Sequence, residues 1–445
     1  MMCKCGYQNT ADAKYCAHCG RRLSGRKGTG RKWLAVAACL AITGIGICNI
    51  LSGRTSTEKE NGGMICFLPV QEKTEIKQVL PAEDGSVAVL YTDGTVRLSD
   101  NSPLAEAVFH WNNVEKLYCD QKYFWQEGDF RRESCYFGLT EDGSVLATDG
   151  TLSDWQDVKD LLFTWQGAVG VTNGGDVLTE DTWEDEASRQ VLEELSDVET
   201  LVYSDIQTTF ACLKKDGTVT LISEGGYLDP YKVHWDNVKE VRDSGHSFYV
   251  IRHDGSVAGG VGDEPYGLAG AVKVADYQDW LFGISEDGRL LTQNGGNIYT
   301  NTGDLMLDAP GSSFYGGEVD ISRFDQVRDI TVCWGLILMN RDGTVESVGS
   351  WPEWDLSAWN HVEKVCSASD EKWENITLYG IKSDGSVVTT RYNSDSMEQT
   401  VTDRYLGWSL QDIYPCTGGV VGLTTDGDLV GDGIYADIDF SVFRR

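Results

Sequence analysis

"LTEDGSV", Leu139 to Val145, places an Asp-Gly pair between two short apolar runs. Asp-Gly in this setting is the strongest short-range signal for a β-hairpin, because a two-residue type I′ turn requires positive φ at both central positions. We therefore predict a strand, a tight turn and a second strand here. Variants of the same stretch recur along the chain, and their spacing decides the fold.

The hairpin signal recurs at a mean spacing of about 42 residues. Upstream of most copies lies a second element, as in "WQDVKDL" (155–161) and "WDNVKEV" (235–241). A repeat of this length, built from a short strand, a loop and a hairpin, is typical of a propeller. We predict an all-β chain, with a β-propeller of seven to nine three- to four-stranded blades over 76–445. The nine copies are centred on Gly94, Gly143, Gly175, Gly217, Gly255, Gly288, Gly343, Gly385 and Gly427.

These units resemble the regulator-of-chromosome-condensation repeat in its compact bacterial form. That unit reads roughly W-x-D-V-x-x-I followed by G-x-x-H-[ST]-x-x-L-x-x-D-G-x-V. The match is closest at "WDNVKEVRDSGHSFYVIRHDGSVAGG" (235–260), which keeps Gly245, His246, Ser247 and the turn. The resemblance covers about residues 76 to 440 and implies blades that bury their apolar faces only against their neighbours. Nine copies exceed the family's usual seven blades, so the sequence leaves the blade number open.

Charge is distributed unevenly along the chain. The formal net charge is −32, yet residues 1–54 hold nine Lys or Arg and one Asp, so the remaining residues carry about −40. Binding to a phosphate backbone requires basic surface, so this acidity argues against nucleic-acid binding, including the chromatin activity of eukaryotic relatives. It fits solubility or a cationic partner.

An apolar segment separates the two charge regimes. "WLAVAACLAITGIGICNIL", Trp33 to Leu51, has 19 residues without a formal charge, close to the ~20 that a membrane-spanning helix needs. A basic linker (23–32) precedes it and a mixed linker (52–75) follows it. The positive-inside rule then predicts a single-pass protein in the cell membrane, with a cytoplasmic N-terminus and an extracytoplasmic propeller. The alternatives are a cleaved signal peptide and a lipoprotein cleavage box at "VAAC" (36–39).

The first 22 residues carry two tight cysteine pairs. Cys3, Cys5, Cys16 and Cys19 lie in "CKCGYQNTADAKYCAHCG" (3–20), and four thiolates at such spacing suit tetrahedral Zn²⁺. The stretch resembles the short zinc ribbon that begins many bacterial membrane proteins, which implies a zinc-binding head (1–22). Its first pair is Cys-x-Cys, one residue shorter than that family's Cys-x-x-Cys, and a metal-free ribbon is the alternative.

Cysteines and histidines beyond the apolar segment do not form a recognisable catalytic set. Seven cysteines follow it, and an odd number cannot form a closed intrachain disulfide framework. We expect five of them, which lie in or beside apolar runs, to be buried as small hydrophobic residues. No Ser/His/Asp set, Cys/His pair or phosphate-binding loop stands out, and we do not expect an enzyme. The five cysteines that we expect to be buried are Cys119, Cys212, Cys333, Cys366 and Cys416.

Insertions rich in aromatic residues interrupt several units. Because antiparallel strands alternate in direction, we expect these insertions on the face opposite the Asp-Gly turns. Trp, Tyr and Arg supply much of the binding energy of interfaces. The predicted ligand-binding residues are therefore Trp125, Arg131 and Arg132 (insertion 119–134), Trp351 and Trp354 (349–359) and Trp373 (367–375). The alternative is that these rings only pack their own loops onto the propeller.

Together these features favour a membrane-anchored binding or sensing module for a protein, glycan or envelope ligand. A structural scaffold within an envelope complex is the second hypothesis, and a propeller-hosted hydrolase is a weaker third. Fold-level resemblance by itself does not carry function.

The cysteine head gives the first testable prediction. A peptide of residues 1–25 should bind Co²⁺ with thiolate charge-transfer absorption, because four thiolates surround the metal. Cys16→Ser should weaken that absorption in the same titration. A spectrum that Co²⁺ leaves unchanged would show a metal-free ribbon.

Overall fold

The computed structural model describes residues 75–444, apart from short gaps, and the chain divides into two compact units, 1–71 and 72–445. The predicted zinc ribbon, basic linker and apolar segment lie outside the described residues, as does the linker up to residue 74. Among the described residues, no helix is long and apolar enough to cross a membrane. The gaps are 127–128, 182, 184, 206, 224–226, 229–234, 244–247, 260–265, 278–279, 302–303, 308–316, 350–353 and 403–406.

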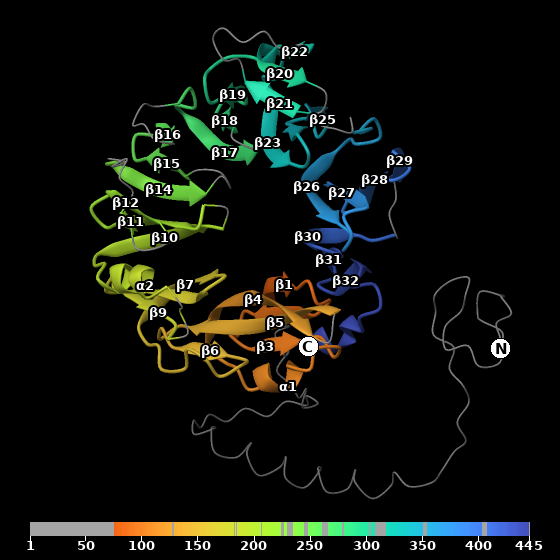
Figure 1. The fold of residues 1–445 in the computed structure, drawn as a ribbon. Helices are drawn as coiled ribbons and strands as arrows, with labels where there is room; N and C mark the ends of the chain where they lie inside the picture. Colours follow the sequence, from red (N-terminus) through yellow and green to blue (C-terminus); the bar gives the residue numbers. More distant parts are fainter. Residues whose placement is uncertain are drawn as a thin grey trace, which may run out of the picture. The chain divides into compact units, whose positions relative to one another are not determined.

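The described residues are nearly all β, as predicted, and their main sheets are antiparallel with the strands in chain order (Figure 1). The first five sheets are β1 (Ile76–Pro81), β2 (Val87–Tyr91) and β3 (Val96–Leu98); β4 (Val114–Gln126), β5 (Asp129–Thr140) and β6 (Val145–Ala147); β7 (Val158–Thr164), β8 (Gly167–Thr172) and β9 (Val177–Thr179); β10 (Val198–Ser204), β11 (Thr209–Lys214), β12 (Val219–Ser223) and β13 (Tyr227–Leu228); and β14 (Val238–Asp243), β15 (Phe248–Arg252) and β16 (Val257–Gly259).

Four more sheets of the same kind follow, and a small sheet is inserted among them. The four are β17 (Ala271–Tyr277), β18 (Trp280–Ser285) and β19 (Leu290–Thr292); β23 (Val327–Val332), β24 (Leu336–Asn340) and β25 (Val345–Val348); β26 (Val362–Ser369), β27 (Asn375–Lys382), β28 (Val387–Asn393) and β29 (Glu398–Thr402); and β30 (Leu410–Cys416), β31 (Gly419–Thr424) and β32 (Leu429–Gly433). The inserted sheet is β21 (Asp304–Leu307), β20 (Ile298–Asn301) and β22 (Gly317–Val319), and the helices are α1 (Ala105–Val108), α2 (Glu186–Glu193) and the 3₁₀ turns η1 (Ile321–Arg323) and η2 (Phe440–Phe443).

Each of the nine predicted hairpins is present between the second and third strands of a sheet, but the predicted turn type is wrong. Gly143 has φ +80°, whereas Asp142 does not have positive φ. Gly143 N–H donates to the Thr140 carbonyl, and Thr140 N–H donates to the Ser144 carbonyl. This pattern is a three-residue loop, a type I turn closed by a left-handed glycine.

The side chain of the turn aspartate explains why a normal turn suffices. The Thr140 hydroxyl (2.6 Å) and Ser144 N–H (3.2 Å) donate to Asp142 Oδ1. These hydrogen bonds, that of Thr140 first, hold the pKa of the Asp142 carboxyl below its ordinary value. The aspartate therefore fixes the turn through its carboxylate and does not need a left-handed backbone.

A backbone hydrogen bond joins seven of the nine turns to the next sheet. Val158 N–H, at the start of β7, donates to the Gly143 carbonyl at 2.9 Å, and a Cβ on Gly143 would lie 2.8 Å from Asp157 Cα. Asp157 itself has φ +57°, a conformation that Asp and Asn tolerate best among residues with a Cβ. The same bond joins Val114 to Gly94, Val198 to Gly175, Val238 to Gly217, Val327 to Gly288, Val362 to Gly343 and Leu410 to Gly385.

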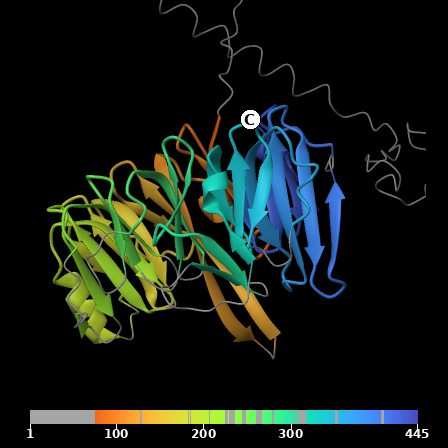
Figure 2. The ribbon, with the colours of Figure 1, turned by 90° about the horizontal axis from the view of Figure 1, so that it is seen from above.

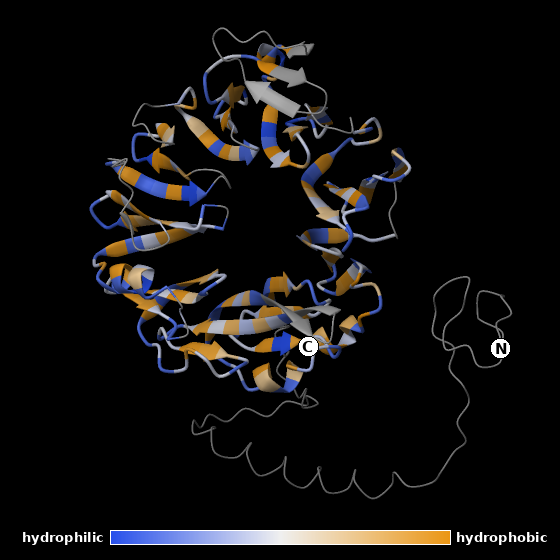
Figure 3. Cartoon of the chain, viewed as in Figure 1, coloured by the Kyte–Doolittle hydropathy of each residue, from blue (hydrophilic) through white to orange (hydrophobic). Residues whose placement is uncertain are grey.

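Apolar clusters fill the spaces between consecutive sheets, and Figure 3 shows hydrophobic residues spread over the sheets. The tryptophan that precedes a first strand is buried in such a cluster. Trp155 is 8% exposed, and a Cβ at Gly170 of β8 would come within 2.7 Å of its ring. The repeat tryptophans Trp111, Trp155, Trp235 and Trp359 are all buried.

The last sheet packs against the first, so the nine sheets form a closed cycle within this unit (Figure 1). Tyr91 Oη donates to the Phe443 carbonyl at 2.6 Å, and Arg97 donates to the Val442 carbonyl at 2.7 Å. Tyr435 is fully buried and its hydroxyl donates to the Ala82 carbonyl at 2.8 Å. The C-terminal segment therefore holds the first sheet in place.

The hydrogen bond between the turn glycine and the first strand of the next sheet, which we call the latch, gives the second prediction. Gly143→Ala and Gly150→Ala both place a Cβ at positive φ, +80° and +77°, which costs about 1–2 kcal/mol. Only Gly143→Ala also collides with the next sheet, because nothing lies within 4 Å of a Cβ at Gly150. Urea unfolding should therefore show a larger loss of stability for Gly143→Ala. Equal losses would show that the close approach to Asp157 does not matter.

Candidate functional site

Two connections join the three main strands of each sheet, and they lie at opposite ends of the sheet. The second strand runs from its connection with the first strand to the Asp-Gly turn, so these two connections lie at opposite ends of each sheet. We call the two ends the tip face and the turn face, respectively. The chain enters the first sheet at Glu75, beside the turn face, because Ile76 pairs with Tyr91 at the end of β2 that leads to Gly94.

The insertion 119–134 lies on the tip face, as predicted, and continues the two strands. β4 and β5 pair from Val114 and Thr140 to Gln126 and Asp129. The resulting hairpin projects beyond the neighbouring sheets in Figure 2. Phe124 is paired with Arg131 and Tyr123 with Arg132 in the backbone register. Regular strand pairing, which the sequence did not indicate, therefore carries this insertion.

A cavity of about 460 Å³ lies on the tip face and is lined by four consecutive sheets of the cycle. Such a volume is within the ~300–1,000 Å³ of small-molecule sites. Its lining residues include aromatic, hydroxyl and thiol side chains, and none of the lining side chains is charged. The lining residues are Tyr277, Val332, Cys333, Trp334, Ser367, Ala368, Ser369, Trp373, Ile376, Pro415, Cys416 and Thr417. We call it the tip cavity.

Trp334 occupies the connection between β23 and β24 and is held from below. Its φ is +49°, uncommon for a bulky residue and of the kind that persists only where the surroundings enforce it. Its ring meets Tyr392 edge-on at 6.0 Å between centroids, and it packs against a buried cluster. Cys333 N–H closes the turn by donating to the Gly335 carbonyl at 3.0 Å.

Trp373 lies in the connection between β26 and β27 and is 58% exposed. Asp370 organises this loop, because Glu374 N–H (2.9 Å) and the Asn375 side chain (2.6 Å) donate to its carboxylate. Partial burial opposes ionisation of Asp370, but the hydrogen bonds, led by that of Asn375, outweigh it and keep the pKa of this carboxyl below its ordinary value. The carboxylate therefore stays charged at the rim of the tip cavity.

The thiols around the cavity are protonated at neutral pH. Burial raises the pKa of Cys333 to about 11 and also raises the pKa of Cys416. The six described cysteines form no disulfide, and Cys212, Cys333 and Cys366 are buried as predicted, whereas Cys119 and Cys416 are only partly buried. A protonated thiol is a weak nucleophile and a small apolar surface.

The predicted site residues are distributed over different environments. Trp373 lines the tip cavity, whereas Trp354 is 4% exposed and its indole N–H donates to the Cys333 carbonyl at 3.3 Å. Trp354 thus packs its own loop, which was the alternative. Trp125, Arg131 and Arg132 lie at the end of the β4–β5 hairpin, and their side chains are outside the described part of the structure. Trp351 and the zinc-ligand candidates Cys3, Cys5, Cys16 and Cys19 lie outside the described residues.

Sequence reasoning missed Tyr277, Trp334 and the hydroxyls of the tip cavity. The available signal was an aromatic residue directly before a glycine between first and second strands, as in Trp334-Gly335. In the described part of the chain, no group of three or more His, Cys, Asp or Glu is placed to hold a metal ion.

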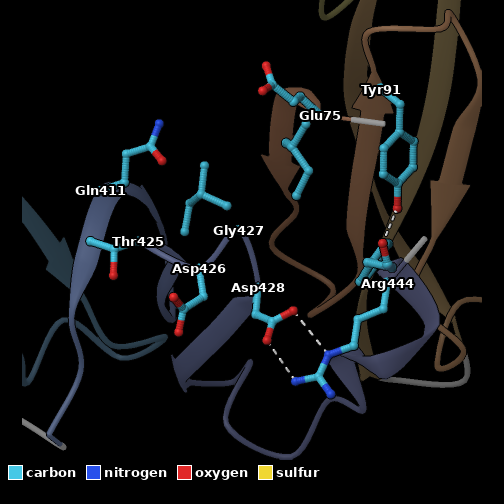
Figure 4. A pocket seen from close by; sticks show the side chains of 11 residues that line it. Glu75, Tyr91, Gln411, Thr425, Asp426, Gly427, Asp428 and Arg444 are labelled. Atoms are coloured by element: carbon cyan, nitrogen blue, oxygen red, sulfur yellow. Dashed lines mark hydrogen bonds and ion pairs between the residues drawn. The ribbon is translucent and has the colours of Figure 1, made fainter. Parts of the chain in front are cut away.

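A second cavity, of about 300 Å³, lies where the last sheet meets the first (Figure 4). Arg444 crosses its wall and forms two hydrogen bonds to the Asp428 carboxylate, at 3.0 and 2.9 Å. Tyr91 and Glu75 contribute to the lining from the first sheet. Because these groups also close the cycle of sheets, we assign this cavity to structure.

Comparisons with known proteins do not identify a family. No protein-family model matches the chain, and no curated protein matches it. Among solved structures, the computationally designed Ika8 protein is similar at 14% identity over 81% of this chain and 96% of its own, with a TM-score of 0.39. PorZ, a bacterial surface component of the type-IX secretion system of Porphyromonas gingivalis, is 12% identical over 81% of this chain and 62% of its own, with a TM-score of 0.27. Hsv2 of Kluyveromyces lactis is 13% identical over 63% of this chain and 74% of its own, with a TM-score of 0.30. At these scores the likenesses carry no argument.

The two tryptophans give the third prediction. Trp354→Ala should lower the free energy of unfolding by about 3–5 kcal/mol, because it removes a buried ring. Trp373→Ala should change it by less than about 0.5 kcal/mol, because the ring is mostly exposed. Urea unfolding of both variants checks this, and a large loss for Trp373→Ala would place that ring in the core.

Proposed function

We propose that residues 76–445 form a β-propeller of the regulator-of-chromosome-condensation type that serves as an extracytoplasmic binding or sensing module. The proposal includes an anchor at 33–51 and a cytoplasmic zinc ribbon at 1–22. The observation that carries the binding role is the tip cavity, a lined hollow with aromatic and hydroxyl groups and an exposed Trp373. Cavities with apolar walls and a few polar groups are the usual form of ligand sites.

The position of Glu75 in the described sheets supports this assignment. The chain enters the sheets beside the turn face, at Glu75, and the tip cavity lies on the opposite face. Glu75 therefore lies at the other end of the sheets from the tip cavity. The expected partner is a protein, glycan or other envelope ligand, and the acidity of the chain disfavours nucleic acid.

Free thiols in the described sheets bear on the compartment. In extracytoplasmic proteins, accessible cysteine pairs are usually oxidised to disulfides. Burial raises the pKa of Cys366 to about 12 and that of Cys212 to about 11, which keeps both thiols unreactive. An oxidising compartment is therefore compatible with these reduced cysteines.

Topology is the fourth prediction. In intact cells, a membrane-impermeant maleimide should label Lys372→Cys, which is exposed on the tip face, more strongly than the wild type. The head cysteines, Cys3 to Cys19, should react only after permeabilisation. Labelling of the head in intact cells, with Lys372→Cys protected, would reverse the proposed orientation.

Capture from membranes tests the binding role. The tagged full chain should retain a specific ligand, and Trp373→Ala should retain less of it. Trp165→Ala is a matched control, because Trp165 is 60% exposed in the corresponding connection of another sheet, between β7 and β8. Equal capture by all three proteins, or none by the wild type, would favour the scaffold hypothesis.

A further inference from the structure

The tip cavity combines aromatic walls with an acidic rim. Tyr277, Trp334 and Trp373 come from three different sheets and line one hollow. The connection 370–374, which carries Trp373, contains three carboxylates and one lysine. Beyond this rim, residues 55–445 as a whole carry about −40. Such a field raises the local concentration of cations and lowers that of anions.

The walls themselves discriminate among cations. Faces of Trp and Tyr attract a cation by about 0.5–2 kcal/mol. No carboxylate is among the lining residues, and Ser367, Ser369 and Thr417 are neutral. A lysine ammonium or an arginine guanidinium in this hollow would give up hydrogen bonds to water and find no carboxylate there to replace them. A quaternary ammonium has no N–H to satisfy, so the same walls suit it better.

A neighbouring hollow extends the site. It shares Ala368 and Ser369 with the tip cavity and adds the side chains of Asp370, Arg391 and Asp432. The Tyr379 hydroxyl donates to Asp432 at 3.0 Å. Polar groups and charged groups of both signs therefore lie beside the tip cavity. This arrangement suits a quaternary ammonium head group carried on a longer polar molecule.

We propose that the tip cavity binds a quaternary ammonium group between Tyr277, Trp334 and Trp373. The inference rests on the proposed binding function and names the ligand class for it. It draws on the aromatic lining, the uncharged walls and the acidic surroundings together.

The fifth prediction uses choline and its neutral isostere, 3,3-dimethylbutan-1-ol, in calorimetric titrations of the full chain. Choline should bind at least about 5-fold more tightly than the alcohol, since the two differ by the charge that the rings attract. Trp373→Ala should weaken choline binding by at least about 5-fold, Trp373→Phe should weaken it less, and Trp165→Ala should leave it unchanged. Circular dichroism melts of each variant confirm that the fold is retained.

Other outcomes overturn the inference. Equal affinity for choline and the alcohol would make the hollow merely apolar, and binding of N-acetylglucosamine in place of choline would make it a saccharide site. No binding of choline would also overturn it. If the membrane ligand is captured through Trp373 but choline does not displace it, the ammonium inference fails and the binding function stands. If choline binds but no ligand is captured from membranes, the ammonium inference stands and the proposed capture of a membrane ligand fails.

Discussion

The hydrogen bond from the first amide of one sheet to the glycine carbonyl in the turn of the preceding sheet governs this fold. Val158 to Gly143 is one instance among seven. It requires a glycine with positive φ on one side and, in five cases, a left-handed Asn, Asp or His on the other, such as Asp157. A Cβ added to Gly143 would lie only 2.8 Å from Asp157 Cα, so neither the glycine nor the residue opposite it tolerates much change. The recurring Asp-Gly motif in the sequence supplies the glycine that this contact requires.

Packing between sheets follows from the same contact. Once the latch fixes the start of a first strand, the tryptophan three residues earlier is directed into the space between two sheets, where Trp155 lies over Gly170. First strands also exchange ion pairs across sheets, such as Lys116 to Asp160 at 2.7 Å. These pairs are half exposed and each contributes only about 0–1 kcal/mol. Apolar burial, which only neighbouring sheets provide, therefore dominates the stability.

The sequence predicted the all-β class and the nine hairpins, because both depend on local turn chemistry or on period. It failed on the turn type, since the hydrogen bonds of Asp142 replace a left-handed aspartate. It failed for Trp354, since insertion in the sequence does not reveal burial against Cys333. Tyr277 and Trp334 were missed because they are far apart in sequence, and only the closure of sheets onto one another brings them to one cavity.

The two faces of the sheets are under different physical constraints, and this difference locates the site. On the turn face, seven of the nine connections place a left-handed glycine in hydrogen-bond contact with the next sheet. On the tip face, no such latch recurs, and the connections range from Thr417-Gly418 to the five-residue loop 370–374 and the long β4–β5 hairpin. Insertion and substitution there leave the seven turn-face hydrogen bonds intact, although Gly418 N–H donates to the Ser369 carbonyl between two sheets at 2.8 Å on the tip face. A binding site can therefore change at most tip-face positions without loss of the turn-face hydrogen bonds, and loops held by a rigid scaffold are where function usually resides. Trp334 shows that the scaffold still contributes, because its unusual backbone is held by the packed cluster beneath it. The tip cavity thus joins one anchored ring to one exposed ring, so the walls of the site combine a fixed surface with an accessible one.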